Sequence, residues 1–367
     1  MQLCNLRVRN LRSFEAAEVE LGQGLTIIFG ANGAGKTSLL EAAQFALCGR
    51  SFRTGREEEM VRRGAGFMRL EAEIQNGGAA ISRTVKLRTG APAAVDPGGG
   101  PIWLDPGSVL SFSPDDLQLV KGPPAGRRRF LDEAITRRQH GYRQLPLDYL
   151  KIISQRNSFL KRARAGLAPL ADISPWDQLL ASTALRTYSA RKEFCRLLAP
   201  HFASAWTALA GGEAGVDLQY VSQLEEAAAA PDPVAEVLGL LRAAWSHDME
   251  RSSTGTGTHR DEMQLLLAGE ALRQFGSQGE QRLAVLALLL AARSLVLEEA
   301  GTPPLMLLDD VLSELDHGRR RRLMDILASG GQAVITAADR GLFLEEELTG
   351  GAVLEVGAGA WAGIHYV

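Results

Sequence analysis

The chain has 367 residues, of which 46% are hydrophobic and 23% charged, an ordinary composition for a globular protein with a substantial core. Its formal net charge of −3 excludes a protein that binds nucleic acid through an overall positive surface. Three scattered cysteines, Cys4, Cys48 and Cys195, form no Cys-x-x-Cys pair and argue against a zinc ribbon or a disulfide framework. We expect a cytoplasmic protein, because the N-terminus lacks a signal-peptide pattern and Arg293 interrupts the most apolar run, 283–297.

The N-terminal part reads as strands around one helix. Two-residue alternation and short apolar runs predict strands at residues 4–8, 17–21, 25–29, 69–74 and 81–88. The run 25–29 is apolar throughout, which is typical of a central buried strand. Helical spacing follows at 37–47, and residues 89–100, almost all Gly, Ala and Pro, predict a surface loop.

From about Gly126 the hydrophobic period becomes helical, so we predict a mostly helical lobe at 118–246 inserted into an α/β domain. The sheet is expected to resume near 263–267. A long helix is predicted at 280–300, with strands at 305–308 and 333–336. Strands that alternate with helices around an apolar parallel core indicate an α/β fold. The predicted domains are 1–117, 118–246 and 247–367.

The segment from Gly30 to Thr37 matches the phosphate-loop pattern G-x-x-x-x-G-K-T, with an apolar strand before it and a helix after it. Glycines let backbone N–H groups face the phosphates, and the helix N-terminus adds partial positive charge. Lys36 would reach the β/γ oxygens, and Thr37 can ligate Mg²⁺. The predicted nucleotide-binding residues here are Gly30, Asn32, Gly33, Ala34, Gly35, Lys36, Thr37 and Ser38.

The apolar strand 305–308 ends in Asp309-Asp310. An Asp at such a strand end can hold Mg²⁺ together with a phosphate loop, which makes Asp309 a predicted metal ligand beside Thr37. Asp310 would polarise the attacking water, so Lys36 and Asp310 are the predicted catalytic residues. The alternative is a pair of carboxylates that cap the next helix.

Small residues in the segment 275–282 lead directly into a long apolar helix, which exposes N–H groups at a helix N-terminus. The phosphate loop binds its nucleotide without a second anion site from the same chain. Ser277, Gln278 and Gly279 are therefore predicted to face the γ-phosphate held by another copy of the chain. The alternative is an ordinary N-cap serine with flexible glycines.

Together these segments resemble the ABC-type ATPase heads, with a phosphate loop, a later Ser-x-Gly-x-Gln, an apolar strand with Asp-Asp, and 313–316 in the place of the D-loop. The resemblance implies a P-loop head with a mostly helical inserted lobe and no long coiled coil, and two ATPs sandwiched in a dimer. It also assigns nucleotide contacts to Arg12, to Gln118 as the Q-loop residue, and to Thr336. Thr336 stands where transporters carry a switch His, and Asp310 stands where most members have Glu, which implies slow hydrolysis.

Asn10-Leu11-Arg12-Ser13-Phe14 is similar to the opening of the DNA-repair and chromosome-maintenance members. Further blocks, which occur in the same order, are similar to the RecF family of bacterial recombination mediators: 50–54, 112–117, 127–132, 155–157 and 259–261. Thr258 departs from the expected Pro. The inserted lobe is too short for the coiled coil and cysteine hook of Rad50-type relatives.

The RecF resemblance implies a weak, DNA-stimulated ATPase that dimerises on ATP and binds duplex or gapped DNA. It also implies RecO and RecR as partners in loading RecA, and release of DNA on hydrolysis. Candidate DNA contacts are Arg127, Arg128, Arg129, Arg156 and Lys161; the alternative for each is a solvated helix face or a partner of a helix C-terminal dipole. The rival hypotheses are a P-loop small-molecule kinase that uses the helical lobe as a lid, and a scaffold that binds ATP without turnover.

Overall fold

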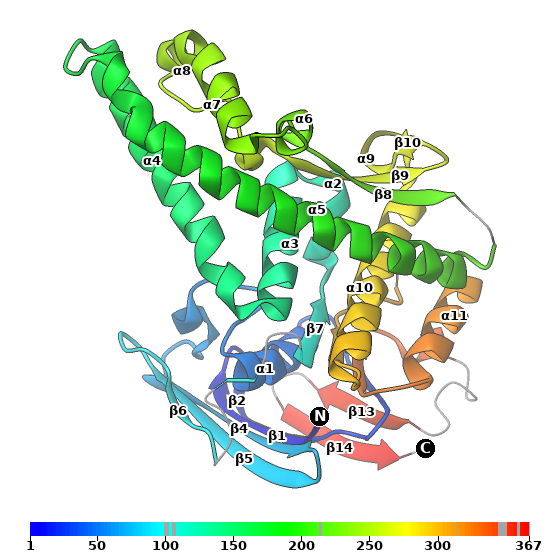
Figure 1. The fold of residues 1–367 in the computed structure, drawn as a ribbon. Coiled ribbons are helices and arrows are strands. Elements are labelled where there is room, and N and C mark those ends of the chain that lie inside the picture. Colours follow the sequence, from blue (N-terminus) through cyan, green and yellow to red (C-terminus); the bar gives the residue numbers. More distant parts are fainter. Residues whose placement is uncertain are drawn as a thin grey trace. The chain divides into compact units, whose positions relative to one another are not determined.

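The computed structural model describes residues 1–98, 103–104, 108–212, 215–313, 315–343, 351–357 and 360–366. The chain divides into two compact units (Figure 1). Unit 1 comprises Met1–Leu117, Ala205–Glu213 and Val285–Val367, and unit 2 comprises Gln118–Ser204 and Ala214–Ala284. The first break coincides with the predicted boundary at 117/118, whereas unit 2 continues beyond residue 246 to Ala284.

The described part of unit 1 contains an antiparallel sheet in the order β2-β1-β4-β5-β6. Its strands are β1 (Gln2–Leu11), β2 (Phe14–Glu20), β4 (Phe67–Asn76), β5 (Ala79–Arg88) and β6 (Ala94–Asp96). The four longer strands were predicted from their alternation. The short β6 lies inside the segment 89–100 that was predicted as loop.

The second sheet of unit 1 has the order β14-β13-β3-β12-β11-β7, and all its described pairs are parallel except β13 with β14. Its strands are β3 (Leu25–Phe29), β7 (Val109–Phe112), β11 (Leu305–Leu308), β12 (Ala333–Ala337), β13 (Ala352–Gly357) and β14 (Ala360–Tyr366). Every residue of β3, β11 and β12 is buried, which explains why all their residues but Thr26 and Thr336 are apolar.

Helix α1 (Lys36–Cys48) packs against both sheets of unit 1 and is buried along most of its length. Its apolar side chains join residues from β1, β4 and β11 in one hydrophobic core. The loop 30–35, which follows β3, therefore leads into the N-terminus of a helix that is packed in the core. A further helix of this unit, α11, spans His317–Ala328.

Unit 2 is mainly helical, as predicted. Its helices are α2 (Gln118–Lys121), α3 (Pro124–Arg138), α4 (Gln144–Arg164), α6 (Glu225–Ala228), α7 (Pro233–Ala243), α8 (Trp245–Arg251) and α9 (Leu272–Phe275). Two long helices, α5 (Ser174–Ala210) and α10 (Gln278–Ala300), run from one unit into the other. Short 3-10 turns occupy Glu57–Met60, Pro114–Leu117, His140–Arg143, Leu170–Ile173, Thr258–Arg260 and Arg340–Leu342.

The strand predicted at 263–267 forms, but the prediction that it resumes the main sheet is wrong. It is β9 (Glu262–Leu267), which pairs with β8 (Val216–Val221) and β10 (Glu270–Ala271) in a separate small sheet of unit 2. The antiparallel register Leu218↔Leu265 turns apolar side chains of both strands to the same face. None of the helices in the described ranges is long and apolar enough to cross a membrane.

Candidate functional site

The loop that follows β3 depends on glycine at specific places. Gly33 and Gly35 have φ values of 84° and 108°, a region that glycine enters without steric cost. A Cβ added to Gly35 would lie 2.4 Å from Cε2 of Phe14, which begins β2. The loop is therefore pressed against the β1–β2 turn, and only glycine fits there.

Lys36 turns back over this loop. Its Nζ donates hydrogen bonds to the carbonyl oxygens of Gly30, at 2.6 Å, and Ala31, at 3.1 Å. Burial lowers the pKa of Lys36, and the carboxylates of Asp310 and Asp309 oppose that change. The ammonium is thus a partly desolvated cation at the mouth of the loop, a setting in which an anionic ligand is strongly favoured.

Asp309 lies across from Thr37 because β11, β12 and β3 are neighbouring parallel strands, whose carboxyl ends meet at one edge. The Thr37 hydroxyl is 3.0 Å from Oδ1 and 2.8 Å from Oδ2 of Asp309. The hydroxyl of Thr336 donates to Oδ1 at 2.7 Å. Hydroxyl and carboxylate oxygens are the ligands that Mg²⁺ prefers, so Thr37 and Asp309 fit a magnesium site.

Asp310 follows with a φ of 48°, a left-handed conformation that is uncommon outside glycine. Its backbone N–H donates to the Thr336 hydroxyl at 2.9 Å. Of the loop residues predicted to bind nucleotide, Asn32 and Gly33 are exposed, whereas Ala34 and Ser38 are buried. Thus the structure brings Lys36, Thr37, Asp309 and Asp310 together.

Arg12 lies at the β1–β2 turn, and its guanidinium is held by Glu41 of α1 through hydrogen bonds of 3.0 and 2.7 Å. A third bond reaches the carbonyl oxygen of Glu59. Glu41 is fully buried and also accepts a hydrogen bond from Ser51 at 2.6 Å. The sequence pointed to Arg12 but not to this buried carboxylate, whose signal would have been the single acidic residue of a mostly apolar helix.

Ser277, Gln278 and Gly279 stand at the start of α10 in unit 2. The Ser277 N–H donates to Oε2 of Glu280 at 2.7 Å, and the Glu280 N–H donates to the Ser277 hydroxyl at 3.3 Å. This reciprocal pair is a capping box, the arrangement that the N-cap alternative required. Ser277 and Gln278 are nevertheless exposed, so the N-terminus of a 23-residue helix is open to solvent.

Gln118 begins α2 in the same unit. Nearby, Gln281 anchors α10 to α9, since its side chain donates to the carbonyl oxygen of Leu272 at 2.9 Å. In unit 1, Ser313 of the predicted D-loop is exposed and donates to the carbonyl oxygen of Asp310 at 3.0 Å. Glu314 of the same segment lies outside the described residues.

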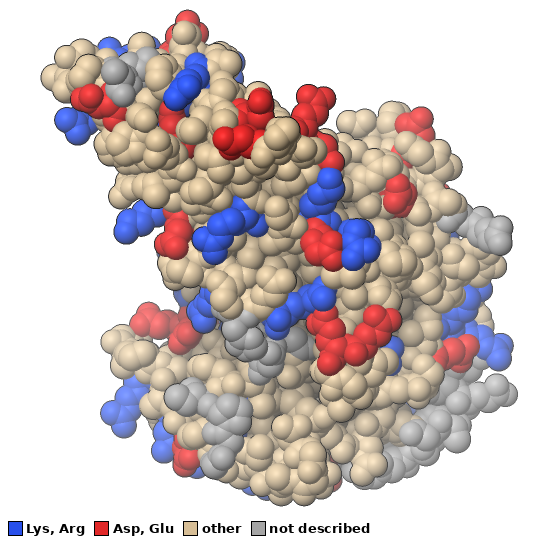
Figure 2. All heavy atoms as spheres, viewed as in Figure 1, with Lys and Arg blue, Asp and Glu red and all other residues tan. Residues whose placement is uncertain are grey.

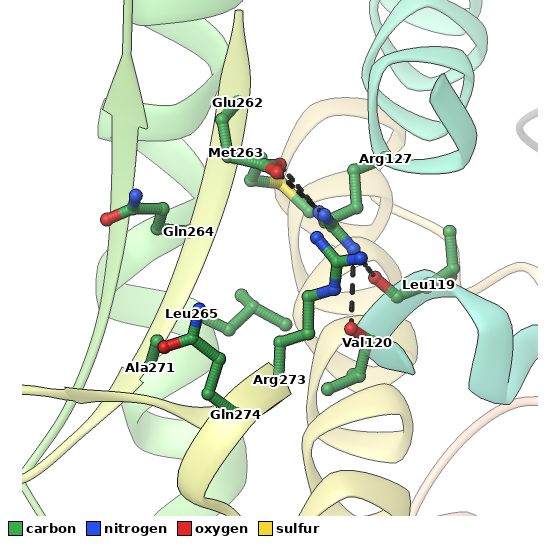
Figure 3. A pocket seen from close by; sticks show the side chains of 10 residues that line it. All are labelled: Leu119, Val120, Arg127, Glu262, Met263, Gln264, Leu265, Ala271, Arg273 and Gln274. Atoms are coloured by element: carbon green, nitrogen blue, oxygen red, sulfur yellow. Dashed lines mark hydrogen bonds and ion pairs between the residues drawn. The ribbon is translucent and has the colours of Figure 1, made fainter. Parts of the chain in front are cut away.

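Two of the predicted DNA contacts are corrected by the structure. Arg127 is only 3% exposed: it bonds both oxygens of Glu262, at 2.6 and 2.7 Å, and the carbonyl oxygen of Leu119 (Figure 3). It also donates to the carbonyl oxygen of Gly122. Arg156 is fully buried between Asp177, at 2.7 Å, and Asp248, at 2.6 Å. Both guanidiniums are used inside unit 2 and cannot reach a DNA phosphate.

The remaining candidates differ in their availability. Arg129 and Lys161 are exposed on α3 and α4, whereas Arg128 is partly buried and donates to the carbonyl oxygen of Asp261 at 2.8 Å. On the face drawn in Figure 2, Lys and Arg are interspersed with Asp and Glu. DNA contacts by Arg128, Arg129 and Lys161 stay a prediction.

The comparisons with known proteins agree with one another. The sequence pattern of an AAA domain matches residues 5–158. The DNA replication and repair protein RecF of Symbiobacterium thermophilum is 35% identical over 92% of this chain and 92% of its own length, and that of Cyanothece sp. is 33% identical over 98% and 97%. The chain belongs to the RecF family.

Solved structures support the same assignment. A RecF described as the recombination mediator protein RecF-ATPrS in the RecFOR pathway matches with a TM-score of 0.83 and 25% identity, covering 98% of this chain and 96% of that one. An Smc head bound to the C-winged helix domain of ScpA matches with a TM-score of 0.56 and 13% identity, a likeness of fold. The prediction of an ABC-type ATPase head with a helical lobe is therefore confirmed.

Proposed function

We propose that this RecF-family chain binds ATP with Mg²⁺ at the loop 30–37 and works as an ATP-dependent recombination mediator on DNA. The observation that carries the proposal is the contact of Thr37 with Asp309 beside Lys36, which joins residues 272 positions apart into one site with carboxylate oxygens for a metal ion and an ammonium for a phosphate. Two solved relatives are described as RecF-ATP and RecF-ATPrS, and the full-length identity supports the same ligand here.

Each residue of the site has a proposed task. The N–H groups of the loop and the N-terminus of α1 cradle the phosphates, and Lys36 neutralises the β/γ oxygens. Thr37 and Asp309 hold Mg²⁺, which when bound neutralises charge on the transferred phosphoryl group. Asp310 orients the attacking water. Because Asp is shorter than the Glu of most ABC-type heads, we expect slow hydrolysis.

The second half of the site comes, in this proposal, from a second copy of the chain. The exposed N-terminus of α10, with Ser277, Gln278 and Gly279, offers N–H groups and partial positive charge to an anion. By its resemblance to the ABC-type heads, this segment faces the γ-phosphate bound to the partner's loop. Gln118 and Arg12 are proposed to respond to the same nucleotide.

The proposed role of the ATP-bound dimer is to bind DNA until ATP is hydrolysed. We propose that it binds duplex or gapped DNA in the cytoplasm, that RecO and RecR join it in helping RecA to load, and that slow, DNA-stimulated hydrolysis releases it. The names of the two relatives from Symbiobacterium thermophilum and Cyanothece sp., both DNA replication and repair protein RecF, and the RecFOR pathway named for two solved relatives support this proposal.

The dimer is tested by measuring molar mass with light scattering, with and without ATP and Mg²⁺. The informative variant is Ser277→Asp, because Asp is as good an N-cap as Ser and preserves the start of α10, yet its carboxylate would repel a phosphate. Ser182→Asp, at an exposed position of α5, is the matched control. We expect ATP to double the mass of the wild type and the control, but not that of Ser277→Asp.

Two results would contradict the proposal. If the molar mass of all three proteins is the same with and without ATP, the protein does not dimerise in response to ATP. Rapid phosphoryl transfer to a small metabolite in the absence of DNA would favour the kinase hypothesis instead.

A further inference from the structure

Thr336 holds both acidic residues of the site through a single oxygen atom. It lies in β12, the strand between β3 and β11, and its side chain is fully buried. The hydroxyl donates its only proton to Oδ1 of Asp309 at 2.7 Å and accepts the backbone N–H of Asp310 at 2.9 Å. A buried hydroxyl with its proton committed in this way is an orienting group, not a ligand contact.

The second of these bonds replaces a missing backbone partner. The pairing of β11 with β12 ends at Leu308↔Ile335, while on the other side the Asp309 N–H still bonds the carbonyl oxygen of Phe112 in β7, at 2.9 Å. Asp310 then turns into the left-handed region. Its N–H leaves the ladder and is received by the Thr336 side chain, so this hydroxyl stabilises a backbone turn that non-glycine residues rarely adopt.

The first bond fixes the orientation of the Asp309 carboxylate. With Oδ1 held by Thr336, the carboxylate presents both oxygens to the Thr37 hydroxyl, Oδ1 at 3.0 Å and Oδ2 at 2.8 Å. Removing a hydrogen-bond partner of a metal ligand commonly lowers the metal affinity by about 10- to 100-fold.

We propose that Thr336 is a positioning residue that does not touch the nucleotide. Its bond to the Asp309 carboxylate sets the affinity for Mg²⁺, and its bond to the backbone N–H of Asp310 sets the orientation of the Asp310 side chain. The inference rests on the proposed ATP and Mg²⁺ site and deepens it. It also replaces the expectation, drawn from the place of the switch His in transporters, that Thr336 contacts the nucleotide directly.

The test compares Thr336→Val, which has nearly the same shape but no hydroxyl, with Thr336→Ser, which keeps the hydroxyl. The readout is the binding of a fluorescent ATP analogue, first in EDTA and then during a titration with Mg²⁺. We expect Thr336→Val to bind the analogue in EDTA within about twofold of the wild type, but to need about tenfold more Mg²⁺ for half-maximal tightening. Thr336→Ser should stay within about threefold of the wild type in both measurements.

The outcomes separate this inference from the proposed function. A wild type that does not bind the analogue, or whose binding ignores Mg²⁺, contradicts the proposed function. If the wild type responds to Mg²⁺ but Thr336→Val needs the same half-saturating Mg²⁺ concentration, the inference is overturned and the proposed function is not. Should Thr336→Val fail to fold, Thr336→Cys, with its weaker hydrogen bonds, must show a smaller rise in that concentration, and an unchanged value overturns the inference as well.

Discussion

His259 is held as a neutral ring in the interior of unit 2. Its Nε2 lies 2.9 Å from the carbonyl oxygen of Thr254 and must carry the proton, so the Tyr149 hydroxyl donates to Nδ1, also at 2.9 Å. Burial is the largest cause that lowers the pKa of His259, and the hydrogen bond to Thr254 opposes it. The family block 259–261 therefore serves the packing of this unit.

This lowered pKa predicts a loss of stability in mild acid. Because the folded pKa lies below the unfolded value of about 6.5, the unfolded chain binds more protons as the pH falls, and the free energy of unfolding decreases below that pH. His259→Gln removes the titration while an amide can still reach both partners. In urea unfolding at pH 7.5 and 5.5, the wild type should lose more stability than this variant, by at most about 1.4 kcal/mol per pH unit. Equal losses would show that other groups dominate.

At the scale of elements, the β1–β2 hairpin and the phosphate loop fit together as one unit. Leu11↔Phe14 closes the hairpin, Asn10 and Arg12 have φ values of 54° and 48°, and the buried Phe14 ring meets Gly35. The segment 10–14, which resembles a family motif, thus also has a physical role in the packing of the phosphate loop. It shapes the surface on which the loop rests.

Gly35→Ala and Gly33→Ala form a matched pair that measures this fit. Both glycines have positive φ, so both variants strain the backbone, but an added Cβ meets nothing within 4 Å at Gly33 and lies 2.4 Å from the Phe14 ring at Gly35. We expect Gly35→Ala to cost about 1–3 kcal/mol more in free energy of unfolding than Gly33→Ala, and to lose nucleotide binding. Similar values for the two variants in denaturant unfolding would argue against the contact with Phe14.

The elements also show what the sequence could predict. The strand, glycine loop and helix, and the strand before Asp309, are continuous segments whose own pattern reveals them. Strand β7 was missed because its four residues carry little alternation, and β9 was assigned to the wrong sheet because its pairing with β8 depends on residues about 45 positions away. Likewise the partners of Arg156, at positions 177 and 248, cannot be recognised without the fold.

At the scale of the whole molecule, the net charge of −3 means that the proposed DNA ligand would have to be held by a few exposed cations against an unfavourable background. The burial of Arg127 and Arg156 narrows the candidates to Arg129 and Lys161, with Arg128 partly accessible. Removing Arg156 instead leaves Asp177 and Asp248 buried without their counter-ion, at a cost of about 3–5 kcal/mol. A loss of DNA binding in an Arg156 variant would therefore report unfolding of unit 2.

Lys161→Glu tests the local contact, and Lys86→Glu, at an exposed position of β5, is its control because both variants change the net charge by the same amount. With ATP and Mg²⁺, we expect Lys161→Glu to weaken binding to gapped duplex DNA at least about tenfold, and to reduce the slope of log affinity against log salt by about 1. Lys86→Glu should change the affinity less than about threefold, since Lys86 is not among the proposed phosphate contacts and an exposed charge outside the interface is screened by salt. Equal losses in the two variants would mean that net charge alone governs the affinity and that α4 does not meet the DNA.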